Sequence, residues 1–167
     1  VGATSCHFAS TVSMERLRRL NPALAQRLHG ISFLQPVARL VDELNMLAPT
    51  VIATYPSAAV LLAEERIGGR LRALPAEVWT GGEDLSAAER DFVQDAFGCP
   101  ATNSYGASEV LSLAFECGQG RVDLNSDGAL LEPVDAQGRA VAPGELPATT
   151  LLTILANHVQ PLIRYDL

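Results

Sequence analysis

Short apolar runs alternate with helix-forming stretches through the middle of the chain, and this alternation constrains the possible fold most strongly. The runs cover residues 51–53, 77–80 and 101–104. Each is too brief to be a helix, and the first is rich in the β-branched side chains typical of buried strands. An order of strand, helix, strand, helix, strand predicts a parallel sheet with right-handed crossover connections.

Capping signals support both intervening helices. Ser57 is placed to cap a helix that ends at the glycine pair 68–69. Ser86 and Glu89 have the spacing of a capping box, in which each side chain satisfies a free amide of the first helical turn. That second helix is predicted to end at Gly98 and to turn four apolar side chains towards the core: Phe92, Val93, Ala96 and Phe97.

The pattern changes after Glu109. Short apolar segments now alternate with turn signals such as Asp127-Gly128 and Pro143-Gly144, which is typical of hairpins in an antiparallel sheet. The predicted segments are 110–115, 121–124, 129–134, 149–155 and 162–165. We therefore expect an α/β fold, with a parallel sheet and crossover helices in residues 1–109 and a β-rich, mostly antiparallel part in residues 110–167.

The pentapeptide Tyr105-Gly106-Ala107-Ser108-Glu109 follows the third predicted strand. Open α/β sheets bind ligands at the carboxyl ends of their strands. A tyrosine can stack on a flat base, a glycine lets a phosphate approach the backbone, and a serine hydroxyl can donate to a phosphate oxygen. A glutamate can hold Mg²⁺ beside the phosphates. The segment therefore suits a nucleoside triphosphate, and its alternative is an ordinary turn from strand to loop.

Five segments together resemble the phenylacetate–CoA ligase-like branch of the adenylate-forming (AMP-binding) enzymes. They occur in the order found in that family. The most specific of them are the segment with Gly81, Gly82 and Glu83 and the pentapeptide that begins at Tyr105. The segments span residues 7–10, 49–57, 80–83, 105–109 and 161–167. The resemblance implies that the chain is a central fragment of the large N-terminal domain of such an enzyme.

The resemblance also implies a role for most residues of these segments. Glu109 would hold Mg²⁺, and Ser108, in place of the family's more common threonine, would contact the α-phosphate. Tyr105 would stack on adenine, with Gly106 and Ala107 in the same wall of the pocket. A second wall would be formed by three consecutive residues, Gly81, Gly82 and Glu83.

Several of these residues also have a purely structural interpretation. Glu83 could cap backbone amides instead, and the two glycines before it could form a plain turn. His7 aligns with a histidine near the acyl site of the family, yet a lone histidine close to a terminus can equally be structural. Ser57, which the resemblance places near the acyl pocket, is already explained as a helix cap.

Composition excludes several classes of function. A net charge of −7 argues against nucleic-acid binding, which needs a basic face. The longest apolar runs are too short to span a membrane, so no membrane partner is expected. The three cysteines form no paired framework and lack Cys-x-x-Cys spacing, so we expect reduced thiols in a cytoplasmic protein and no zinc.

The function predicted from the sequence is part of an ATP-dependent acid–CoA (or acid–AMP) ligase. The resemblance implies ATP and Mg²⁺, coenzyme A in the complete enzyme, and a carboxylic acid, an aryl acid among the possibilities, as substrate. We expect the fragment alone to be inactive, and its apolar edges to allow self-association. The alternative is a non-catalytic module, derived from the same fold, that binds a nucleotide or a partner protein.

Overall fold

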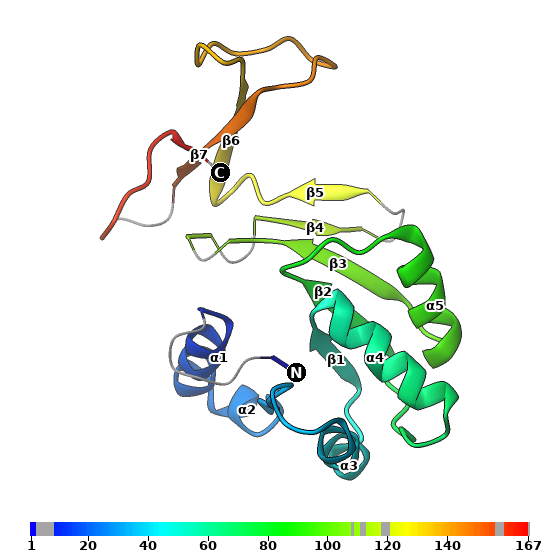
Figure 1. Cartoon of the computed structure of the whole chain (residues 1–167). Helices are drawn as coiled ribbons and strands as arrows, with labels where there is room; N and C mark the ends of the chain where they lie inside the picture. Colours follow the sequence, from blue (N-terminus) through cyan, green and yellow to red (C-terminus); the bar gives the residue numbers. More distant parts are fainter. Residues whose placement is uncertain (3–8, 108, 111–112, 118–120, 156–158, 167) are drawn as a thin grey trace. The chain divides into compact units, whose positions relative to one another are not determined.

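The computed structural model describes residues 1–2, 9–107, 109–110, 113–117, 121–155 and 159–166 (Figure 1). The chain divides into two compact units, Val1–Val122 and Asp123–Leu167. Each unit is described below by itself. No helix of the described residues is both long enough and apolar enough to cross a membrane.

A five-stranded sheet forms the centre of the first unit, with strand order β1-β2-β3-β4-β5. The first three strands, β1 (Val51–Thr54), β2 (Glu77–Gly81) and β3 (Ala101–Tyr105), are parallel neighbours. This confirms the parallel sheet predicted from the sequence. Strand β4 (Ala114–Glu116) pairs antiparallel with β3, and β5 (Val122–Leu124) completes the sheet.

Three helices pack together with the parallel strands: α3 (Val37–Leu47), α4 (Pro56–Ile67) and α5 (Ala87–Phe97). The last two are the crossovers, and they lie side by side on the sheet (Figure 1). One core cluster combines the strand residues Ile52, Val78 and Ala101 with Leu62 of α4, Val93 of α5 and several residues of α3. Alternate strand positions face away from this core, and Trp79 is half exposed among them.

The crossover helices confirm both predicted ends of α5 and correct two other predictions. The capping box of α5 is present, and Gly98 follows the helix with φ +66°. Ser57 does not cap α4: the helix begins one residue earlier, at Pro56, because proline suits the first helical position, and Tyr55 is the N-cap. Phe92 does not face the core; it stays 36% exposed, while Val93 and Phe97 are buried.

Two helices precede this layer. Helix α1 spans Ala9–Leu20, and the single-turn helix α2 spans Pro22–Ala25. Asn21 separates them and accepts a hydrogen bond from Ala23 N through its side chain (3.1 Å), which caps α2. Gly2 then forms a bridge to Ser32, so the chain start lies beside the segment that leads to α3.

The second unit is a three-stranded antiparallel sheet with strand order β6-β7-β8. Strands β6 (Ala129–Val134) and β7 (Thr149–Ile154) are paired along their full length, and β8 (Tyr165–Asp166) pairs with β7. The antiparallel C-terminal part predicted from the sequence is thus confirmed. Among the described residues of this unit, the buried side chains are few: Ala129, Val134 and Leu152.

Candidate functional site

The carboxyl ends of the three parallel strands meet at one edge of the sheet. Strand register places Thr54 opposite Thr80, and Gly81 opposite Ser104. The segments that follow, Gly82-Glu83 and Tyr105-Gly106, therefore leave the sheet on the same side. Gly82 and Tyr105 therefore lie at the same end of the sheet.

Both glycines of this edge are in close contact with a neighbouring strand end. A Cβ atom at Gly81 would lie only 2.6 Å from Ser104 Oγ and 3.0 Å from the Ser104 carbonyl oxygen. Gly82 has φ +81°, and a Cβ atom there would lie 3.0 Å from Cε1 of Tyr55. Glycine is thus required at Gly81 for close approach and at Gly82 for both approach and conformation.

Glu83 uses its carboxylate on the start of α4. Its oxygens accept hydrogen bonds from Ser57 N (3.0 Å) and from Ser57 Oγ (3.1 Å). The charge therefore stabilises a helix N-terminus, where backbone amides have no intrahelical partner. This is the capping role that the sequence left open for Glu83, reached across 26 residues of chain.

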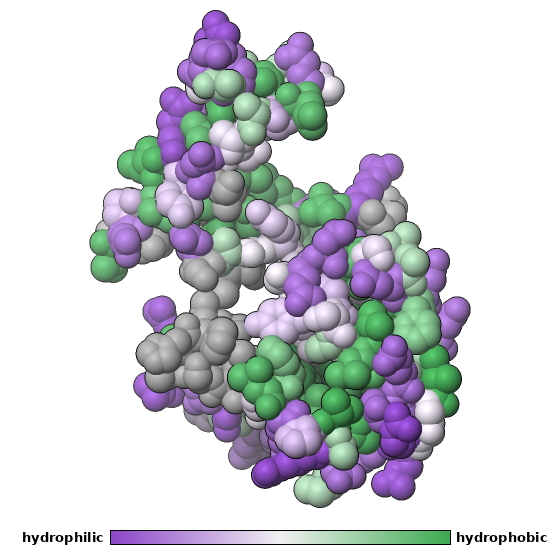
Figure 2. Space-filling view, in the orientation of Figure 1, coloured by the Kyte–Doolittle hydropathy of each residue, from purple (hydrophilic) through white to green (hydrophobic). Residues whose placement is uncertain are grey.

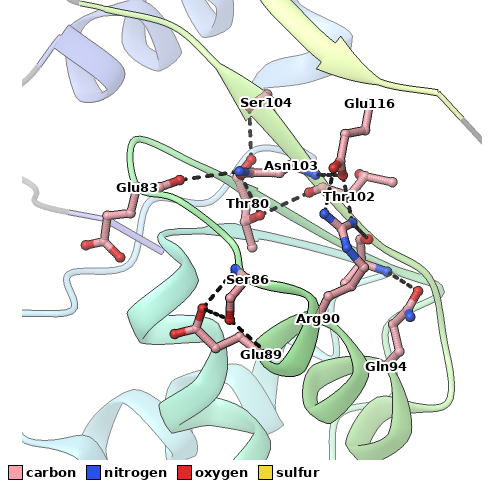
Figure 3. A network of polar contacts seen from close by, with 11 residues as sticks. Thr80, Glu83, Ser86, Glu89, Arg90, Gln94, Thr102, Asn103, Ser104 and Glu116 are labelled. Atoms are coloured by element: carbon pink, nitrogen blue, oxygen red, sulfur yellow. Dashed lines mark hydrogen bonds and ion pairs between the residues drawn. The ribbon is translucent and has the colours of Figure 1, made fainter. Parts of the chain in front are cut away.

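Asn103 joins the two segments at this edge, as Figure 3 shows. Its side-chain oxygen accepts from Thr80 Oγ1 (2.8 Å), and its side-chain nitrogen donates to the Glu83 carbonyl (3.3 Å). Ser104 Oγ donates to the Thr80 carbonyl (2.9 Å). Asn103 was not singled out from the sequence, and Thr80 entered only as the first residue of the segment 80–83, although their positions near the predicted strand ends could have indicated them.

Arg90 of α5 and Glu116 of β4 form an ion pair next to β3, also drawn in Figure 3. Arg90 Nη1 and Nη2 lie 2.7 and 2.6 Å from the two carboxylate oxygens, and Asn103 N donates to the same carboxylate at 2.7 Å. Burial opposes ionisation of Glu116, but the hydrogen bonds from Arg90 and Asn103 outweigh it and lower the pKa of this carboxyl. Sequence reasoning missed the pair because its members lie far apart in the chain.

Tyr105 presents its side chain at this edge with 55% of its surface exposed. Beyond it the chain turns back, since Ala107 N donates to the Val110 carbonyl (2.9 Å) and Val110 N donates to the Ala107 carbonyl (3.1 Å). Glu109 lies in this turn and is exposed. Ser108 and His7, the other predicted catalytic residues, lie outside the described residues.

An apolar groove of about 370 Å³ lies next to the glycine edge. Tyr55 forms part of its wall and makes an edge-to-face contact with Phe33, with ring centroids 5.5 Å apart. Its other lining residues are Leu40, Ser57, Ala58, Leu61 and Glu83. Apolar side chains also gather at the visible surface over α4 in Figure 2. The resemblance placed Ser57, one of these lining residues, near an acyl pocket, and that role stays a prediction.

The described residues suit one face of a nucleotide. An exposed tyrosine ring can stack on a base. Glu109 offers one carboxylate, and Mg²⁺ in nucleotide sites commonly takes one or two carboxylates, with phosphate oxygens and water completing its shell. Among the residues that the structure describes, no group of three His, Cys, Asp or Glu side chains converges on a metal position.

Comparison with solved structures shows the fold of acyl-CoA ligases. A 2-hydroxyisobutyryl-CoA ligase in complex with R3-HIB-AMP matches with a TM-score of 0.74 and 22% identity over 99% of this chain and 37% of the ligase chain. A long-chain-fatty-acid-CoA ligase from Archaeoglobus fulgidus matches with a TM-score of 0.65 and 11% identity over 90% of this chain and 33% of that chain.

A benzoate CoA ligase from Burkholderia xenovorans LB400 matches with a TM-score of 0.60 and 17% identity, over 80% of this chain and 32% of that chain. No protein-family profile and no curated protein sequence matches the chain. The chain therefore shares the fold of one part of these ligases, and it spans about a third of their length.

Proposed function

We propose that the chain supplies the base-stacking and metal-facing wall of the nucleotide site in an adenylate-forming acid–CoA ligase, of the kind that includes phenylacetate–CoA ligases. The observation that carries the proposal is the shared strand edge, where Gly81–Gly82 and Tyr105–Gly106 leave neighbouring parallel strands together. The likeness in fold to ligases solved with acyl-AMP supports it.

The proposed reaction has two steps. A carboxylate oxygen of the acid attacks the α-phosphorus of ATP, and the bond to the pyrophosphate leaving group breaks. The thiolate of coenzyme A then attacks the acyl carbon, which gives the thioester and releases AMP. The first step brings together like charges, so a metal ion and fixed hydrogen-bond donors are needed to stabilise its transition state.

Each residue at the edge has a defined part in this proposal. Tyr105 stacks on adenine, and Gly81 and Gly82 form the second wall of the pocket, where they allow the close approach of Ser104 and Tyr55. Glu109 would hold Mg²⁺, which would offset the like charges of the carboxylate and the phosphates, and Ser108 would donate to a phosphate oxygen. Glu83 acts indirectly, since its carboxylate fixes the start of α4 and its carbonyl receives Asn103.

The test is acid-dependent release of pyrophosphate by a protein that contains this chain within a complete ligase fold. Glu109→Gln should keep the fold and lower the adenylation rate by a factor on the order of 10² or more, as expected when electrostatic stabilisation of a transition state is lost. Glu132→Gln, which removes a carboxylate from the second unit, is the matched control and should leave the rate unchanged. An unchanged rate in Glu109→Gln removes Glu109 from the mechanism, and a complete lack of acid-dependent release favours the non-catalytic binding module.

A further inference from the structure

Where the pairing of β3 with β4 ends, side chains instead of a strand form the hydrogen bonds to the backbone of β3. The ladder pairs Ser104 with Phe115 and Tyr105 with Ala114. One residue before this ladder, the Glu116 carboxylate accepts from Asn103 N at 2.7 Å. Two residues further back, Arg90 Nη1 donates to the Ala101 carbonyl at 2.8 Å. The edge of β3 is therefore held by an ion pair instead of by a neighbouring strand.

The geometry of this pair is well defined. Both guanidinium Nη atoms bind the Glu116 carboxylate, and the side chains of Arg90 and Glu116 are only 24% and 13% exposed. A two-pronged contact of this kind fixes the relative orientation of its partners as well as their distance. Since Arg90 belongs to α5 and Glu116 to β4, the pair locks a crossover helix, an antiparallel strand and β3 together.

Asn103 carries this constraint to both parts of the proposed nucleotide wall. Its backbone N–H is bound to Glu116, and its side chain contacts Thr80 Oγ1 and the Glu83 carbonyl. Tyr105 follows two residues later on the same strand. A shift of β3 would therefore move Tyr105 and release the loop at Glu83 together.

We propose that Arg90 and Glu116 are positioning residues, which hold β3 so that Asn103 keeps the Gly82-Glu83 loop and Tyr105 in one wall. The nucleotide-facing part of this inference rests on the proposed function above. The mechanical part does not, because it concerns the arrangement of the strand ends without a ligand. The two parts can therefore be tested separately.

The chain offers a matched control in Glu65 and Arg70. This pair also joins a largely buried carboxylate to two nitrogens of an arginine, at the far end of α4. Both residues are in the same unit as Arg90 and Glu116, but none of their mutual hydrogen bonds involves β3 or the Gly82-Glu83 loop. Glu65→Gln and Glu116→Gln therefore each remove one largely buried carboxylate charge from a two-pronged arginine contact, with Arg70 more exposed than Arg90, and only Glu116→Gln should disturb the strand ends.

The first experiment measures amide hydrogen exchange by NMR on the ligand-free chain. Glu116→Gln should make the amides of residues 79–83 and 102–105 exchange at least about tenfold faster relative to the rest of the first unit. Glu65→Gln should leave that ratio unchanged. Equal acceleration throughout the unit, or the same local effect in both variants, would overturn the positioning role.

Arginine variants make the test graded. Arg90→Lys keeps the charge but can bind only one carboxylate oxygen at a time, whereas Arg90→Met keeps much of the volume and removes all donors. The exchange ratio should rise from wild type to Arg90→Lys to Arg90→Met. Equal ratios in Arg90→Lys and wild type would contradict the need for two-pronged contact, even if Glu116→Gln does not fold.

The second experiment titrates AMP at roughly millimolar concentrations and follows the ring resonances of Tyr105. Wild type and Glu65→Gln should bind with equal affinity, and Glu116→Gln should bind at least about fivefold more weakly. Equal affinity in all three proteins overturns the link between the ion pair and the nucleotide wall. If no protein responds to AMP, the nucleotide-facing part of the inference is overturned for the isolated chain, and the exchange experiment still decides the mechanical role.

Discussion

The two crossover helices are neighbours of similar length, 12 residues in α4 and 11 in α5, but their N-termini are stabilised in different ways. Helix α5 carries its own cap, because Ser86 and Glu89 bind each other's backbone amides. Helix α4 begins with proline and has no side-chain cap of its own; Glu83 supplies the missing acceptor from another loop. The start of α5 is therefore stabilised by neighbouring residues in the sequence, and the start of α4 by a residue from a distant part of the chain.

Burial follows the same division. Helix α4 is buried at several positions over its length, among them Ala59, Leu62, Ala63 and Glu65. Helix α5 is buried at Val93 and Phe97 only, with Phe92 at the surface. A helix enclosed by the fold depends on its surroundings for stability, whereas a one-sided helix depends more on its own sequence. The predictions below test this contrast.

The largest expected effect is that of Leu62→Ala in α4. Leu62 is fully buried, so the substitution should lower the free energy of unfolding by about 2–5 kcal/mol. Val93→Ala in α5 removes one carbon fewer, and should cost about 1 kcal/mol less. Urea unfolding followed by the fluorescence of the single tryptophan, Trp79, measures both. Equal or reversed costs would contradict the greater dependence of α4 on packing.

Gly82→Ala should have the next largest effect. At φ +81° a side chain is strained by about 1–2 kcal/mol, and contact with the Tyr55 ring adds to this cost. Gly98→Ala is the matched control: its φ of +66° is also positive, but no atom lies within 4 Å of the new Cβ. Chemical unfolding of both variants should show the larger loss at Gly82. A larger loss at Gly98 would mean that the ring moves aside freely.

The elements of the first unit could be predicted because their signals are local. The apolar runs at β1 and β2 and the capping box of α5 lie within a few residues each, and all are present in the structure. Phe92 was placed wrongly because a helical pattern does not show how wide the covered face is. Only packing against the sheet decides that Val93 and Phe97 are buried and Phe92 is not.

The bonds that organise the candidate site could not be predicted in the same way. Glu83 reaches Ser57, and Glu116 reaches Arg90 and Asn103, across more than ten residues of chain in each case. Such contacts depend on strand register and helix packing, which no short pattern specifies. The sequence thus indicated the positions of Gly82 and Tyr105 at one sheet edge, but not the residues that hold them there.

Loss of the local cap should have a moderate effect. Ser86→Ala removes the hydroxyl that accepts from Glu89 N, and should lower the free energy of unfolding by about 1 kcal/mol. Glu83→Gln, the corresponding change at α4, keeps an oxygen for Ser57 N and loses the charge and the acceptor of Ser57 Oγ. Because that hydroxyl can rotate to accept from the new amide instead, the cost should be smaller, about 0.3–1 kcal/mol. Thermal unfolding compares them, and a larger cost for Glu83→Gln would mean that α4 depends on its distant cap more than α5 does on its own.

The capping box should also respond to pH. Hydrogen bonds from the Ser86 hydroxyl and the Ser86 backbone N–H lower the pKa of Glu89. A carboxyl with a lowered pKa stabilises the fold above its ordinary pKa, and this contribution is lost as the pH falls through the lowered value. The difference between Ser86→Ala and wild type should therefore shrink towards acid pH. A difference that stays constant down to full protonation would exclude the ionised Glu89 from the cap.

The smallest expected effect is that of Thr54→Val in β1, the strand that leads into α4. Unlike the other substitutions, it should not lower the free energy of unfolding. Thr54 ends β1 and is buried, and its Oγ1 has no hydrogen-bond partner in the described part of the structure. Thr80, which pairs with it in register on β2, donates to Asn103 Oδ1 at 2.8 Å. Thr54→Val should leave the free energy of unfolding unchanged or raise it by up to about 1 kcal/mol, because it removes an unsatisfied polar atom.

Thr80→Val is the control for this last comparison. It leaves Asn103 Oδ1 without its donor, and should cost about 1–3 kcal/mol. Unfolding midpoints in urea for the two variants and wild type are sufficient to rank them. If Thr54→Val destabilises the protein as much as Thr80→Val, the Thr54 hydroxyl has a hydrogen-bond partner in solution. That partner would be a water molecule buried at the end of β1, which crystallography can test.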